Sequence, residues 1–78
     1  MSTIAVERAP LAVSVAFDSD EMTVVLVDGR RLSVPLQWFP RLAAATPAER
    51  EACELIGDGE GIHWPNLDED ISVEGLLR

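Results

Sequence analysis

The residue types best suited to chemistry gather near the end of the chain, between residues 61 and 77. His63 is the only histidine, and the consecutive carboxylates Asp68, Glu69 and Asp70 follow it. A histidine exchanges protons near neutral pH, and histidine and carboxylates are common metal ligands. Consecutive side chains diverge, however, so this run does not surround a point as a metal site must. The pattern predicts no metal, cofactor or catalytic residue, and it leaves open a small-molecule-binding or enzymatic domain centred on His63.

The same segment could instead form a contact surface for another protein. Trp64 follows His63, and one of the two tryptophans is expected to be a partly exposed anchor of the kind that interfaces use. Asp68, Glu69 and Asp70 could pair with basic residues of a partner. They could equally precede a final helix, where negative charge is favourable. We predict Trp64, Asp68, Glu69, Asp70 and His63 as partner-binding residues.

Composition favours a basic protein as the partner. The chain of 78 residues has a net charge of −8, from 14 acidic residues against 6 arginines. This charge repels nucleic acid and anionic lipid, and it speeds encounter with a basic protein. The chain has no apolar run of the ~20 residues that span a bilayer. The single cysteine, Cys53, excludes an internal disulfide, so we expect a cytoplasmic protein that binds no membrane.

The elements that must hold this segment begin with a three-stranded antiparallel meander. Apolar and polar residues alternate over 13–17, 22–26 and 32–34, with Val13, Val15 and Phe17 on the core face of the first strand. A three-residue loop, 27–29, keeps apolar residues opposite one another and predicts Gly29 in a left-handed conformation. The outer face, with Ala12, Ala16, Val25 and Val27, is either covered by the chain or pairs with another molecule. The sequence therefore leaves open the formation of a homodimer through this face.

Short helices and a further strand are predicted after the meander. Pro40 begins a helix over 40–45, and a capping box at Thr46 and Glu49 begins another that runs to Gly57. A short fourth strand over 62–64 and a helix from Ser72 complete the chain. The fold class is therefore α+β: a three-stranded antiparallel meander plus a short fourth strand, packed with two or three short helices. Residues 1–10 are expected to be a flexible N-terminal arm and 11–78 a single small domain.

Three blocks of this sequence together resemble a known family. They are residues 24–36, the Trp-Phe-Pro-Arg-Leu block at 38–42 with residues 45–50, and the stretch from 61 to 77. The chain is similar in these blocks to the domain of unknown function 2442 family. The resemblance implies a small bacterial α+β protein, often encoded beside another small protein in a layout similar to a toxin–antitoxin pair. It implies no catalytic motif.

The function predicted is therefore a small acidic protein-interaction module, antitoxin-like, that binds and neutralises a small basic partner protein, a possible toxin. We expect it not to be an enzyme. The further alternative is a DNA-binding transcriptional regulator that acts with a partner, since some relatives implied by the resemblance carry a helix-turn-helix segment. We expect none here, so we do not expect the protein alone to bind nucleic acid.

Overall fold

The computed structural model describes residues 10–77, which form two antiparallel sheets, so the predicted N-terminal arm lies almost entirely outside the described residues. Each sheet has three strands that follow one another in chain order. The first contains β1 (Ala12–Phe17), β2 (Glu21–Leu26) and β3 (Arg31–Pro35), and the second contains β4 (Glu54–Ile56), β5 (Gly61–Trp64) and β6 (Glu69–Ser72).

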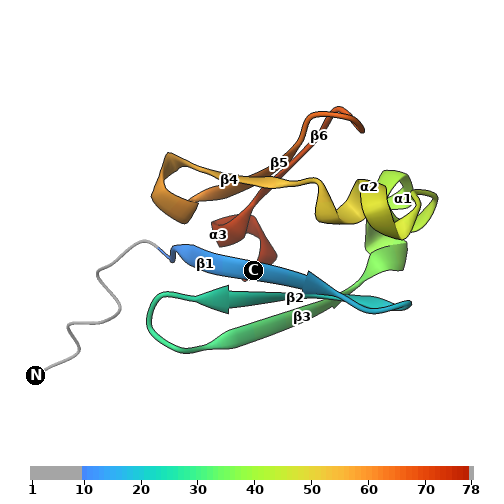
Figure 1. Ribbon diagram of the computed structural model, residues 1–78. Helices are drawn as coiled ribbons and strands as arrows, with labels where there is room; N and C mark the ends of the chain where they lie inside the picture. Colours follow the sequence, from blue (N-terminus) through green and yellow to red (C-terminus); the bar gives the residue numbers. More distant parts are fainter. Residues whose placement is uncertain (1–9, 78) are drawn as a thin grey trace, which may run out of the picture.

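Short helices connect and flank the sheets (Figure 1). The α-helices α1 and α2 lie together at one end of the molecule, and α3 follows β6 on the side that faces the first sheet. They are α1 (Pro40–Ala43), α2 (Pro47–Glu51) and α3 (Val73–Leu76), with the 3-10 helices η2 (Leu36–Trp38) and η3 (Gly57–Gly59). The α+β class is confirmed, whereas the single meander with one extra strand is replaced by two complete sheets.

The hairpin between β2 and β3 has the predicted register. Val24 pairs with Leu32 and Met22 with Val34, and Gly29 has a φ of 95°. Met22 and Val24 are fully buried, so the three-residue loop keeps the apolar face of the hairpin on the core side.

The predicted orientation of the side chains is wrong for the first residues of β1. Its register with β2 shifts between Ala12 and Ser14, which marks a β-bulge. The extra residue turns Val13 outward, with 53% of its surface exposed, and leaves Ala12 buried at 3%. Ala16 and Val27 are exposed as well, so the described chain does not cover this outer face.

The helix predicted from Thr46 to Gly57 ends at Glu51 instead. Its capping box is present: the Thr46 hydroxyl accepts from the Glu49 backbone N–H, and the Glu49 side chain accepts from the Thr46 backbone N–H. Beyond α2 the chain turns into β4, where Leu55 pairs with Ile62. Pairing with β5 overrides the local helical pattern, and the glycines after Ile56 form the connecting turn.

Both sheets contribute to one core. Buried side chains of β2 and β5 belong to the same cluster, which includes Val24, Ile62 and Trp64. The Trp64 ring meets Phe17 of β1 edge to face, with the ring centroids 6.4 Å apart. The Trp64 indole N–H donates to the Arg50 carbonyl at 2.8 Å, so the one side chain joins β5 to β1 and to α2.

The backbone of η3 lies directly against β1. Gly59 is buried with a φ of 106°, and a Cβ atom there would lie 2.3 Å from the Ala12 carbonyl oxygen. Only glycine permits both this conformation and this approach. The close contact therefore sets the distance between the two sheets at this end.

We expect Gly59→Ala to lower the free energy of unfolding by about 2–5 kcal/mol, the sum of left-handed strain and overpacking. Gly29→Ala is the matched control, because Gly29 also has a positive φ but a Cβ there meets nothing within 4 Å. It should cost only about 1–2 kcal/mol. Urea unfolding of both variants makes the comparison, and equal losses would contradict the packing role of Gly59.

The turn between β1 and β2 carries a pH-dependent contact. Asp18 Oδ1 accepts hydrogen bonds from the backbone N–H groups of Asp20 and Glu21, both at 2.7 Å. These two bonds lower the pKa of Asp18 below its ordinary value, the bond from Asp20 having the larger effect. The folded state therefore favours the ionised carboxylate, so the contact stabilises the protein above the unfolded-state pKa and is lost as the pH falls through the folded one.

We predict that Asp18→Asn is less stable than the wild type at neutral pH and that the difference disappears at acid pH, where the wild-type carboxyl is also uncharged. Thermal melts at a series of pH values measure this. Glu51→Gln, which changes an exposed carboxylate of α2 by the same chemistry, is the control at neutral pH and should stay within about 0.5 kcal/mol of wild-type stability. A constant deficit for Asp18→Asn across the series would contradict the assignment.

Candidate functional site

The hairpin of β5 and β6 carries the residues predicted to contact a partner. His63 pairs with Asp70, and Trp64 pairs with Glu69. Because side chains alternate across a strand, Trp64 points to the core and His63 to the opposite face. Glu69 and Asp70 belong to β6, and α3 follows with Ser72 as its N-cap, so the acidic run precedes the final helix as expected but lies partly on a strand.

Trp64 is not part of any contact surface. Its side chain is fully buried in the core, so the prediction of Trp64 as a partner-binding residue is wrong. Ile62 lies two residues earlier on the same face of β5, and this spacing in the sequence was the signal for a core position. The exposed tryptophan is Trp38, with 65% of its surface accessible at the end of η2.

His63 and Asp70 are in direct contact. His63 Nδ1 lies 2.5 Å from Asp70 Oδ1, with side-chain exposures of 33% and 68%. The carboxylate can orient the imidazole ring and would pair with its protonated form. Glu54 of β4 pairs with His63 on the other side, so all three residues form one row across the outer face of the second sheet.

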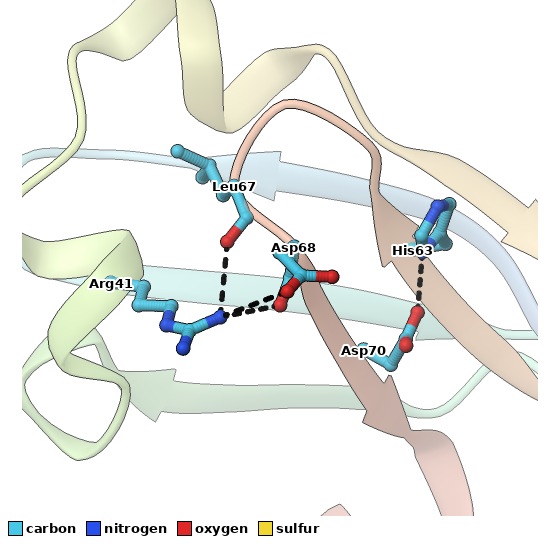
Figure 2. Close-up of polar contacts among 5 residues, drawn as sticks. All are labelled: Arg41, His63, Leu67, Asp68 and Asp70. Carbon is cyan, nitrogen blue, oxygen red and sulfur yellow. Dashed lines mark hydrogen bonds and ion pairs between the residues drawn. The ribbon is translucent and has the colours of Figure 1, made fainter.

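Arg41 of α1 holds the turn that leads into β6 (Figure 2). Its Nη1 donates to the carbonyl oxygens of Asp68, at 2.6 Å, and of Leu67, at 3.3 Å. The Asp68 side chain lies 3.9 Å from Arg41 and is 98% exposed, so this ion pair adds little. Asp68 therefore contributes to this turn mainly through its backbone carbonyl group, and its φ is 53°.

A groove lies between η2 and β6, with a volume of about 430 Å³. We call it the Trp38 groove. Its lining combines apolar side chains with the acidic residues of the strand: Trp38, Phe39, Glu69, Asp70, Ile71, Ser72, Gly75 and Leu76. The structure thus brings Glu69 and Asp70 together with an aromatic side chain that the sequence did not single out for this surface.

Other chemistry receives less support from the described residues. Among residues 10–77, no group of histidine, cysteine and carboxylate side chains is arranged to hold a metal ion. Burial raises the pKa of the Cys53 thiol, which makes it a poor nucleophile. Cys53 lies between α2 and β4 rather than in the predicted helix. Within this range there is also no helix long and apolar enough to cross a membrane.

Comparison with known proteins shows the same fold in two solved structures. A crystal structure of a protein of unknown function from Rhodospirillum rubrum has a TM-score of 0.78 and 32% identity, covering 90% of this chain and 87% of that one. A solution structure of an uncharacterized protein from Chromobacterium violaceum has a TM-score of 0.73 and 28% identity, covering 86% and 63%. No curated protein matches. The model of the family "Protein of unknown function (DUF2442)" matches residues 12–78, and the chain belongs to this family.

Proposed function

We propose that this protein is an acidic interaction module that binds and neutralises a small basic partner protein, as an antitoxin does. The observation that carries this proposal is the Trp38 groove, where a largely exposed indole lies beside Glu69 and Asp70. Tryptophan is among the residues that contribute most to protein interfaces when a partner buries it. The carboxylates beside it favour a basic partner and select its orientation.

The charge of the whole chain supports the same kind of partner. A net charge of −8 creates a negative field that raises the rate of association with a positively charged protein. This contribution is screened by salt, because exposed charges lose their interaction beyond the Debye length of ~10 Å at 0.1 M salt. Complex formation should therefore be faster and tighter at low salt.

Three of the four arginines in residues 10–77 bind groups of their own chain, which supports a protein ligand over a nucleic acid. Arg41 and Arg50 donate to backbone carbonyl groups, and Arg30 pairs with the neighbouring Asp28. A nucleic-acid surface needs several cations directed at phosphates. These three side chains instead stabilise turns and helix ends of their own chain.

One observation favours a second candidate function. The contact between His63 and Asp70 is the arrangement that a small-molecule-binding or enzymatic site would use to orient an imidazole. The hollows on the two sides of β6 are lined by Asp70 but not by His63. The His63→Ala variant tests this candidate, because a variant that binds every ligand found for the wild type with equal affinity removes it.

The proposed function predicts that tagged protein captures a small basic protein from the lysate of its native cells, and that high salt releases it. With the captured protein purified, Trp38→Ala should weaken the complex by at least about 2 kcal/mol, or roughly thirtyfold in Kd. Calorimetric titration measures the two affinities. Because Trp38 is exposed, the variant should change the stability of the free protein by no more than about 0.5 kcal/mol.

Val27→Ala is the control for this experiment. Val27 is similarly exposed, at 61%, but lies at the turn between β2 and β3 and does not line the Trp38 groove. Its complex should have the wild-type Kd. The proposal fails if no basic protein is enriched at either salt concentration, or if Trp38→Ala binds the purified partner as tightly as Val27→Ala does.

A further inference from the structure

Within residues 10–77, the second sheet ends in a strand that pairs on one side only. In its strand order, β4-β5-β6, β6 pairs only with β5, so the other side of β6 is an edge (Figure 1). An edge strand presents unpaired backbone N–H and C=O groups that can pair with an added strand. Recognition by strand addition obtains affinity from these groups and specificity from alternate side chains.

The hydrogen-bond pattern identifies the groups that point outward. Val73 N–H donates to the Glu60 carbonyl at 3.0 Å, in register with the ladder of β5 and β6. Bonded pairs recur at every second residue of an antiparallel ladder, so Ile71 pairs with Ile62 by hydrogen bonds. Asp70 and Ser72 lie at the intervening positions, and their N–H groups point away from β5. Within residues 10–77, no backbone or side-chain acceptor binds these two N–H groups.

Hollows lie on both sides of this edge. The Trp38 groove is one, and a second hollow of about 590 Å³ is lined by Pro10, Ile56, Gly57, Glu60, Gly61 and Glu74. Both hollows are also lined by Asp70, Ile71 and Ser72 of β6. An added strand would direct successive side chains to the two faces of the sheet in turn. The two hollows are placed to receive these alternating side chains.

The chemistry of the two hollows differs. The Trp38 groove offers Trp38, Phe39 and Leu76, which suit an apolar side chain. The second hollow has the carboxylates of Glu60 and Asp70 at its walls, which suit a basic one. Resting on the proposed function, we infer that β6 binds an extended segment of the basic partner by strand addition, and that basic and apolar residues alternate along this segment.

The same charges argue against a second copy of this chain as the occupant. Two β6 edges brought together would place Glu69 and Asp70 of both copies close to one another, and like charges on facing strands are destabilising. Acidic side chains on an edge strand discourage self-pairing in this way. The same acidic side chains would attract a basic segment.

The other edges are less suited to an added strand. β3 ends in Pro35, which has no N–H group to donate, and β4 contains only three residues. β1 contacts α2, β4 and η3, which lie along it. Among the strand edges of the described chain, β6 is therefore the one that combines outward N–H groups with a hollow on each face of the sheet.

The test uses two synthetic peptides of identical composition, titrated by calorimetry at low salt. In one, lysine and valine alternate; in the other, all lysines precede all valines. We expect the alternating peptide to bind at least about tenfold more tightly, because only it directs its two residue types to opposite faces. Equal affinity of the two peptides, or no binding of the alternating one, would overturn the inference.

A pair of variants isolates the backbone contribution. Asp70→Pro removes the outward N–H group without breaking a bond to β5, whereas Asp70→Ala removes the carboxylate and keeps the N–H. Asp70→Pro should weaken binding of the alternating peptide at least about tenfold, and Asp70→Ala by less than about fivefold, as for an exposed charge. Equal losses in the two variants would contradict strand addition. If Asp70→Pro does not fold, the Asp70 and Ser72 amides of the wild type must become protected from hydrogen exchange when the peptide binds.

These outcomes separate the inference from the proposed function. If the purified partner binds Asp70→Pro and Asp70→Ala equally well but loses affinity for Trp38→Ala, the interaction function holds and strand addition is wrong. If no basic protein is captured, the proposed function fails whatever the peptides do.

Discussion

The buried indole of Trp64 is the contact on which the arrangement of the two sheets depends. It packs edge to face on Phe17 of the first sheet and donates to the Arg50 carbonyl of α2. Arg50 in turn donates to the carbonyl groups of Leu42 and Ala43 in α1. Loss of a buried tryptophan side chain costs about 3–5 kcal/mol, a large part of the stability of a small domain. This single side chain therefore relates β5 to both helices and to the other sheet.

The candidate binding edge follows from this arrangement. With α1 connected to β5 through Arg50 of α2, Arg41 reaches the turn after β5 and donates to the carbonyl groups of Leu67 and Asp68. The turn directs β6, whose inner face supplies Ile71 to the core and whose outer edge pairs with no other strand of the described chain. The 3-10 helix η2, immediately before α1, places Trp38 beside β6. The edge strand, its acidic side chains and the exposed aromatic ring thus come together from separate parts of the chain.

Sequence reasoning succeeded where local chemistry decides the structure. The register of β2 and β3 followed from placing Val24 opposite Leu32, and the capping box at Thr46 followed from side chains a few residues apart. It failed where distant pairing decides. The sequence pattern around Leu55 predicts a helix, but Leu55 pairs with Ile62 of β5, so the local pattern does not predict β4.

The candidate site shows the same division. Glu69 and Asp70 were selected for their charge, and both line the Trp38 groove. The prediction of Trp64 as a contact residue is wrong because the burial of a tryptophan depends on which strands and helices surround it. The spacing of Ile62 and Trp64 on one strand face indicates a core position for Trp64.

Amide hydrogen exchange of the free protein, measured residue by residue by NMR, tests whether β6 presents an open edge. The amides of Asp70 and Ser72 should exchange rapidly, while that of Ile71, bonded to β5, should exchange slowly. Slow exchange at Asp70 and Ser72 in the free protein would show that the edge is already paired, by another part of the chain or by a second copy. That result would contradict the proposed docking of a partner strand.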